Sequence, residues 1–169
     1  MTPLPLALGG DGALVAWRLD AARYAASWDS GEGAQVVGGR WNSPGRRAVY
    51  CSLDPACAIL EVAVHLGFRV LDLIPHVLTR VSFTEGPRPF VVQPPTVPNA
   101  QWLRPGIPSA GQQRFGDQLL DTHAIIVIPS AVSRRSWNLV FDPTRSRDSY
   151  ALRLQEPFAV DPRLHPAVE

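Results

Sequence analysis

The pattern of apolar and polar positions predicts a chain of strands interspersed with a few helices. Short apolar or alternating segments, bounded by Gly, Pro, Asp or Ser, are typical of strands. They occur at residues 13–19, 48–52, 76–83, 124–130, 137–143 and 149–158. Helical spacing occurs at residues 20–28, 53–68 and 112–121. Because strands and helices do not alternate regularly, we expect an α+β fold, formed by a single domain over residues 1–169.

The segment LDPACAILEVAVHLGF at residues 53–68 is the clearest helix. Asp54 is an N-cap residue, Pro55 suits the first turn, and Gly67 can end the helix. The residues between them are apolar on every face, which predicts a buried helix. We also expect Asp20 to cap the preceding helix at residues 20–28.

Two segments carry no clear pattern of either kind. Residues 29–39 read as a Gly-rich loop, and residues 86–111 form a Pro-rich, irregular excursion that could be a lid or a partner surface. Neither has the character of a linker to a second domain, and the sequence contains no internal repeat.

Composition narrows the class of protein. With 46% apolar residues, 18% charged residues and a net charge of +1, the chain is typical of a soluble globular protein and not of a dedicated nucleic-acid binder. All 16 basic residues are arginines, whose planar forks suit phosphate and carboxylate groups. We expect Cys51 and Cys57 to be reduced, buried thiols, and the protein to be cytoplasmic, without a membrane segment or a metal site.

Glu61 is the most informative single residue. It lies within an apolar helical face that Cys57 and Leu60 share, and a buried carboxylate is costly unless it is paired or hydrogen-bonded. Such carboxylates cluster at active sites. A wet helix edge, or a pair with His65 one turn later, would explain Glu61 equally well.

The stretch GGRWNSPGRRAVY at residues 38–50 combines flexible backbone, cationic side chains and aromatic rings. Gly38 and Gly39 would let a ligand approach the backbone, so that Arg40 could bind a phosphate bidentately. We expect Arg46 and Arg47 to lie on a solvated turn. Packing in the core remains an alternative for the aromatic residues of this region, among them Tyr24, Trp41 and Tyr50.

Two further residues lie at strand ends. Arg18 follows an apolar strand and could equally be an ordinary surface residue. Ser130 closes the strand AIIVIPS, where a hydroxyl commonly makes a local hydrogen bond, and no GxSxG motif surrounds it.

Together these segments resemble the RES-domain family. The resemblance rests on AWRL with Arg18, GGRWNSPGRRAVYCS with Arg40, DPACAILEVAVHL with Glu61, VIPSAV with Ser130, and WNLVFDP with Asn138, and it spans residues 14–143. One departure is that Asp142 precedes Pro143, where the family more often has Asn.

The resemblance implies an ADP-ribosyltransferase-like fold and a toxin that degrades NAD by phosphorolysis or hydrolysis. NAD would be the substrate, inorganic phosphate an optional co-substrate, and no cofactor would be needed. The implied partner is an Xre-type helix-turn-helix antitoxin that covers the active site. ADP-ribosylation of a protein and a non-catalytic binding module remain alternatives, and the oligomeric state, including a homo-oligomer, stays open.

The same resemblance assigns roles to residues. Glu61 would stabilise the oxocarbenium-like transition state, Arg18 would bind phosphate, and Ser130 would orient the ribose or the nucleophile. These three are the expected catalytic residues. The expected substrate-binding residues are Tyr24, Arg40, Trp41, Asn42, Tyr50 and Asn138.

Overall fold

The computed structural model describes residues 14–83 and 88–164 and contains a seven-stranded sheet in the order β4-β5-β6-β2-β1-β3-β7. The strands are β1 (Leu14–Ala21), β2 (Val49–Ser52), β3 (His76–Phe83), β4 (Phe90–Val91), β5 (Ile125–Pro129), β6 (Trp137–Phe141) and β7 (Tyr150–Phe158). Neighbouring strands are antiparallel except β4 and β5, which are parallel. The sheet and its helices confirm the predicted α+β class.

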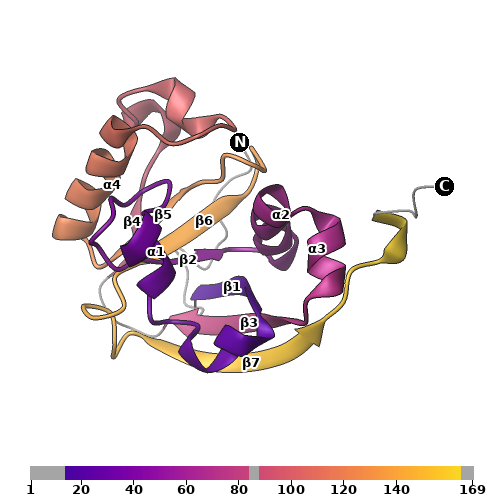
Figure 1. The fold of residues 1–169 in the computed structure, drawn as a ribbon. Helices are drawn as coiled ribbons and strands as arrows, with labels where there is room; N and C mark the ends of the chain where they lie inside the picture. Colours follow the sequence, from indigo (N-terminus) through magenta and orange to yellow (C-terminus); the bar gives the residue numbers. More distant parts are fainter. Residues whose placement is uncertain (1–13, 84–87, 165–169) are drawn as a thin grey trace.

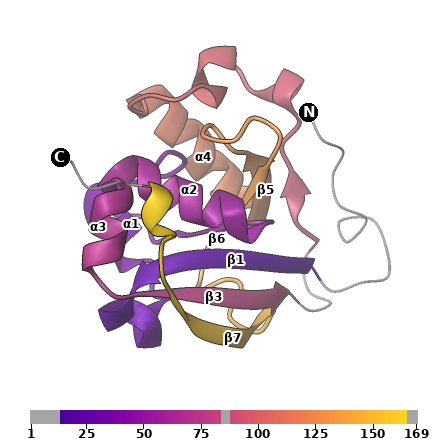
Figure 2. The ribbon, with the colours of Figure 1, turned by 90° about the vertical axis from the view of Figure 1, so that its right-hand side faces the viewer.

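The helices lie on different sides of a strongly twisted sheet. They are α1 (Glu32–Val37), α2 (Pro55–Leu66), α3 (Phe68–Leu73) and α4 (Ala110–Thr122), together with the 3₁₀ turns η2 (Ala22–Ser27), η3 (Pro94–Thr96), η4 (Ala100–Leu103) and η5 (Pro162–Leu164). Strands β5 and β6 run in a different direction from β1, β3 and β7 (Figures 1 and 2). Helix α4 lies beyond β5 and β6, whereas α2 and α3 lie on the opposite side (Figure 1). None of the helices in the described part of the chain is long and apolar enough to cross a lipid bilayer.

Three apolar clusters hold these layers together. The largest joins strands β1 and β3 to strands β5 and β6, and it includes Ala16, Val81, Val127, Leu139 and Phe141. A second packs α4 and the loop before β2 against β5 and β6, and a third packs α2 and α3 against β1 and β3. Because clusters cover both faces of β5 and β6, every residue of these strands is buried. This burial explains why both strands read as continuous apolar runs in the sequence.

All six predicted strands are present, within one or two residues at their ends. The predicted helix at residues 53–68 is α2, and the Asp54 carboxylate accepts a 2.7 Å hydrogen bond from the Cys57 amide as an N-cap. One detail is wrong: α2 is not buried on every face, because Val64 and Leu66 are exposed. Its buried residues are Cys57, Ala58 and Ala63.

Several local predictions are wrong. The segment predicted as an Asp-capped helix at residues 20–28 instead holds the end of β1 and the 3₁₀ turn η2 (Ala22–Ser27), because Asp20 belongs to β1 and binds Arg18. The expected loop at residues 29–39 contains α1, and α3 was not predicted. The Pro-rich excursion is irregular as expected, although its described part holds β4 and the turns η3 and η4.

Helix α4 confirms the helix predicted at residues 112–121, and the structure explains the glycine within it. A Cβ atom at Gly116 would lie 2.1 Å from the carbonyl oxygen of Trp41. The backbone of the loop at residues 38–46 therefore packs directly on α4, and a side chain at position 116 would separate the two.

Candidate functional site

The Glu61 carboxylate lies where α2 meets the ends of two strands. Its Oε1 atom accepts a 2.7 Å hydrogen bond from the Ser130 hydroxyl, which follows β5, and a 2.6 Å hydrogen bond from Nδ2 of Asn138 on β6. The structure thus brings together three residues that the sequence predicted for the site. His65 is exposed, and no ion pair joins it to Glu61 in the described residues.

The Ser130 hydroxyl is fixed by its own loop. It accepts hydrogen bonds from the amides of Val132, at 3.1 Å, and Ser133, at 2.9 Å, so its single proton is directed to Glu61. Ser130 is also buried, with 1% of its surface exposed. The local hydrogen bond that the sequence suggested therefore exists, and it serves to aim the hydroxyl at the carboxylate.

A second layer of polar groups supports Asn138. Its Oδ1 atom accepts a 2.8 Å hydrogen bond from the Ser52 hydroxyl and a 3.7 Å contact from the Cys57 thiol. Burial raises the pKa of the Cys57 thiol, so the thiol stays protonated and able to donate. The sequence did not assign Ser52 and Cys57 to the site. The signal for Cys57 was its position one turn before Glu61 on the same helical face.

Arg18 is held by its own strand and by the neighbouring one. Its guanidinium binds the Asp20 carboxylate through two hydrogen bonds, of 2.7 and 2.6 Å, and donates a 2.9 Å bond to the carbonyl of Tyr50 on β2. Burial raises the pKa of Asp20, although the positive charge of the adjacent Arg18 partly offsets this rise. Arg18 is thus placed beside β2 before any ligand binds.

Arg40 contacts the Pro-rich excursion. Its guanidinium donates to the carbonyls of Trp102 at 3.4 Å, Arg104 at 3.3 Å and Gly106 at 2.8 Å. Burial lowers the pKa of Arg40, and the charge of Glu61 counteracts this effect. The two side chains are therefore within electrostatic reach of each other.

The other polar groups of the stretch at residues 38–50 are used inside the loop. The Tyr50 hydroxyl accepts a 2.9 Å hydrogen bond from the Trp41 amide and donates a 2.7 Å bond to Oδ1 of Asn42. The Asn42 amide in turn donates to the carbonyls of Ala34, Ser43 and Arg46. Trp41 is 1% exposed and Asn42 0%. This burial corrects the prediction that Trp41 and Asn42 contact substrate: they build the loop.

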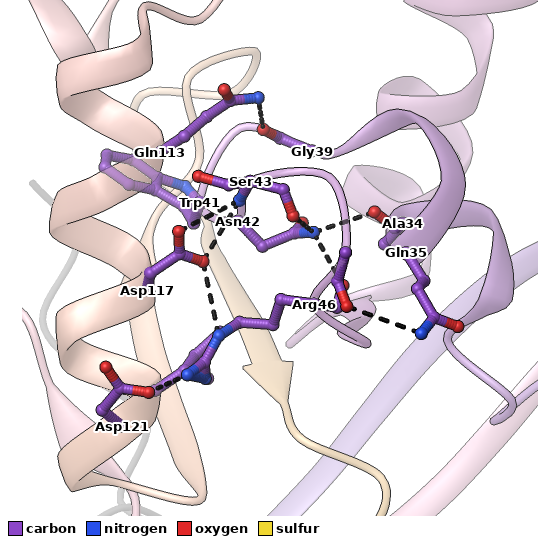
Figure 3. Close-up of polar contacts among 12 residues, drawn as sticks. Ala34, Gln35, Gly39, Trp41, Asn42, Ser43, Arg46, Gln113, Asp117 and Asp121 are labelled. Atoms are coloured by element: carbon purple, nitrogen blue, oxygen red, sulfur yellow. Dashed lines mark hydrogen bonds and ion pairs between the residues drawn. The ribbon is translucent and has the colours of Figure 1, made fainter.

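The loop is also attached to α4 (Figure 3). The Asp117 carboxylate accepts a 3.1 Å hydrogen bond from the Ser43 amide and lies 3.4 Å from Nε of Arg46, which also pairs with Asp121. Gln113 donates to the carbonyl of Gly39 at 3.0 Å. The expectation of a solvated turn is thus wrong for Arg46, whereas Arg47 is exposed.

Gly39 has a role different from the predicted one. A Cβ atom at Gly39 would lie 2.5 Å from the Tyr50 hydroxyl and 2.7 Å from Oδ1 of Asn42. The glycine is needed because the loop packs on these side chains, and this requirement holds without any ligand.

Tyr24 lies apart from these contacts. It belongs to η2, is 51% exposed, and has the Arg23 guanidinium 4.8 Å from the centre of its ring. Within the described residues, no hydrogen bond or ring contact joins Tyr24 to Glu61, Ser130 or Asn138.

A cavity of about 440 Å³ opens beside Ser130. It is lined by Ala100, Leu103, Arg104, Pro129, Ser130, Arg134 and Arg135. No group of three or more His, Cys, Asp or Glu residues in the described part of the chain could hold a metal ion. The candidate site therefore combines a carboxylate oriented by Ser130 and Asn138, the Arg40 guanidinium within electrostatic reach of it, and a cavity with three further arginines in its walls.

Comparisons with known proteins identify relatives of this chain. A protein named Toxin Res from Photorhabdus laumondii is 33% identical over 132 residues, which are 77% of this chain and 82% of that protein. Toxin Res from Pseudomonas putida is 32% identical over 158 residues, 89% of this chain and 99% of that protein. A "Prs ADP-ribosylating toxin" from a Sphingobium species is 28% identical over 163 residues, covering 88% and 94% of the two chains.

The fold also resembles a solved structure, the M. tuberculosis MbcT–MbcA toxin–antitoxin complex. The TM-score is 0.72 at 20% sequence identity, and the match covers 88% of this chain and 85% of that chain. The model of the RES domain matches residues 15–162, which is most of the chain. The family resemblance seen in the sequence is therefore confirmed, and the chain belongs to the RES domain family.

Proposed function

We propose that this protein is the toxin of a toxin–antitoxin pair and that it cleaves the bond between nicotinamide and ribose in NAD. One observation carries the proposal: Ser130 and Asn138 hold Glu61 by one carboxylate oxygen, within electrostatic reach of the Arg40 guanidinium. The relatives named Toxin Res support the toxin role.

The chemistry of NAD suits these groups. When the bond breaks, its electron pair moves to the nicotinamide nitrogen, and the ribose carbon becomes cation-like before water or phosphate attacks it. Both hydrogen bonds that the carboxylate accepts from the described residues go to Oε1, so Oε2 of Glu61 has no donor among them. That oxygen would face the developing positive charge or hold a ribose hydroxyl.

The arginines would bind the anionic part of the substrate. Arg18 is positioned by Asp20, and Arg40 donates only to neutral carbonyl groups, so its charge is not neutralised by a direct ion pair in the described residues. Tyr50 lies between their influences: its carbonyl accepts a hydrogen bond from Arg18, and its phenol is within electrostatic reach of Arg40. Its ring would stack near the nicotinamide. Ser130 would orient Glu61, because its hydroxyl donates to the carboxylate.

The test is product analysis of NAD incubated with purified protein, with and without inorganic phosphate. Free nicotinamide together with ADP-ribose would indicate hydrolysis, and ADP-ribose 1″-phosphate would indicate phosphorolysis. Glu61→Gln keeps an oxygen for Ser130 and Asn138 but removes the charge, and it should abolish both products. Intact NAD after prolonged incubation with the unaltered protein would contradict the proposal and favour the non-catalytic binding module.

A second candidate is transfer of ADP-ribose to a protein. The name of the Sphingobium relative, an ADP-ribosylating toxin, favours it. The same site would serve, because only the attacking group differs. With NAD labelled in its adenylate part, label on a protein would support transfer, whereas label remaining in small molecules would support breakdown.

The partner of such a toxin would be an antitoxin. The fold shared with the toxin–antitoxin complex supports this part of the proposal, and the resemblance seen in the sequence suggests the Xre type. Co-expression with the protein encoded by the adjacent gene tests it: a small helix-turn-helix protein that co-purifies and suppresses NAD loss is the expected result. Continued NAD loss in a stable complex would argue against neutralisation at the site.

A further inference from the structure

The cavity beside Ser130 has arginines from two separate parts of the chain in its walls. Arg134 and Arg135 come from the loop that follows β5. Arg104 comes from the Pro-rich excursion, immediately after η4. Ser130 itself lines the cavity and donates to Glu61, so the cavity begins one hydrogen bond away from the carboxylate.

These three arginines are not neutralised by the protein around them. All three side chains are exposed, and the cavity lining contains no carboxylate. Across residues 14–83 and 88–164, the arginines that form ion pairs are Arg18, Arg46, Arg47 and Arg163, so none of the three cavity arginines is paired with a carboxylate there. Three like charges around a volume of about 440 Å³ repel one another, and an anion that enters removes this repulsion.

Both walls are held in place before any ligand enters. The carbonyls on either side of Arg104 are bound by Arg40, and the amide of the buried Gln112 donates a 3.0 Å bond to the carbonyl of Trp102. The other wall is a tight turn in which the Ser130 amide donates to the Ser136 carbonyl at 3.0 Å. The hydroxyls of Ser133 and Ser136 close it with a 2.8 Å bond. A preorganised site loses less entropy when a ligand binds.

We infer that this cavity binds a phosphate group next to Glu61, through Arg104, Arg134 and Arg135. Guanidinium forks match the oxygens of phosphate bidentately, and the volume admits a phosphate or a diphosphate with part of its sugar. The inference deepens the proposed function and rests on it for the identity of the ligand. The phosphate could be the diphosphate of the dinucleotide or free inorganic phosphate used in the reaction.

The experiment measures binding instead of turnover, so its outcome does not depend on whether NAD is cleaved. ADP-ribose, inorganic phosphate and adenosine are each titrated by calorimetry into the full-length Glu61→Gln protein. The titrations are repeated with two cavity variants of the Glu61→Gln protein. One also carries Arg134→Ala and Arg135→Ala, and the other also carries Arg104→Ala. The matched control adds Arg69→Ala and Arg114→Ala, which remove the same charge from exposed positions on α3 and α4 that do not line the cavity.

We expect the Arg134 and Arg135 substitutions to weaken binding of the phosphate-bearing ligand about tenfold or more, and the control to change it by less than about twofold. Weakened ADP-ribose binding identifies the diphosphate of the dinucleotide, and weakened binding of inorganic phosphate alone identifies free phosphate. Adenosine, which lacks phosphate, should be unaffected.

Equal affinities in the cavity variant and in the control would overturn the inference, as would the absence of any phosphate-dependent binding to the Glu61→Gln protein. Phosphate-dependent binding without NAD cleavage by the unaltered protein would refute the proposed reaction and leave the phosphate site standing. Thermal melts of all variants exclude a loss of fold as the cause.

Discussion

The Ser130 hydroxyl donates a 2.7 Å hydrogen bond to the Glu61 carboxylate, from a position 69 residues later in the chain. The same oxygen accepts from two amides of its own loop, so its rotation is fixed. The direction of the carboxylate is therefore set by the turn after β5 and not by α2 alone. This relationship leads to a first prediction about Ser130.

Ser130→Ala should lower the rate of NAD cleavage by about tenfold or more, because a hydrogen bond to a charged group is lost and Glu61 can turn away. The effect should be on kcat more than on KM, since Ser130 is expected to orient Glu61 instead of holding the substrate. Steady-state kinetics measure this split. Thr122→Val is the matched control, because the exposed Thr122 hydroxyl bonds only the Gln118 carbonyl of its own helix among the described residues. A pure rise in KM for Ser130→Ala would contradict the orienting role.

Asn138→Asp should impair the site through charge instead of size. It would place a second carboxylate within hydrogen-bond distance of Glu61, where Asn138 now donates at 2.6 Å. Two adjacent carboxylates cannot both ionise easily, so the pKa of the pair rises. The acidic limb of the pH profile of kcat/KM should therefore move to higher pH than in the unaltered protein. An unchanged profile with only a lower plateau would show that the charge at this position is not coupled to the reaction.

Gly116→Ala should destabilise the fold, although the same change usually stabilises a helix. The added Cβ would lie 2.1 Å from the Trp41 carbonyl oxygen, and this atom is backbone that cannot rotate away. We expect the free energy of unfolding to fall by about 1–3 kcal/mol, as for other overpacked positions. Thermal and urea unfolding measure this change. Gly33→Ala in α1 is the control, because a Cβ there meets nothing within 4 Å, and it should stabilise by about 0.5–1 kcal/mol. Equal stability of the two variants would disprove close packing of the loop on α4.

Cys51 should make the fold sensitive to alkaline pH. Burial raises the pKa of its thiol from 9.0 to about 12, so the folded state keeps the thiol neutral while the unfolded chain ionises it. The stabilisation is complete below pH 9.0 and is lost as the pH rises toward about 12. The loss should approach about 1.4 kcal/mol per pH unit for this one group.

The measurement compares the free energy of unfolding of the unaltered protein and of Cys51→Ala at several values above neutral pH. The substitution lowers stability at neutral pH because it leaves space in the core, but its curve should be flatter in the alkaline range. The difference between the two proteins should thus shrink as pH rises. Parallel curves would show that Cys51 does not titrate differently in the two states.

Much of the local structure could be predicted from the sequence because the determining forces are local. Strands β5 and β6 read as short apolar runs, and the Asp54 cap with Pro55 and Gly67 marked both ends of α2. The failures occurred where a long-range contact outweighed the local pattern. Asp20 was expected to cap a helix, but β1 continues to Ala21 by pairing with β3, and Asp20 lies opposite Val77 in that pair.

The candidate site also combines features that the sequence determines with features that only the tertiary structure determines. The sequence by itself determined that Glu61 is an unusual carboxylate on an apolar helical face, and its motifs determined the RES family. Only the tertiary structure decided which residues meet this carboxylate, because Ser130 and Asn138 reach it through the pairing of β5 with β6. It also decided that Trp41 and Asn42 are buried in the loop, whereas Arg104 and Arg134 line one cavity. Residue type shows which chemistry a side chain can perform, but burial and distance depend on how segments far apart in the sequence pack together.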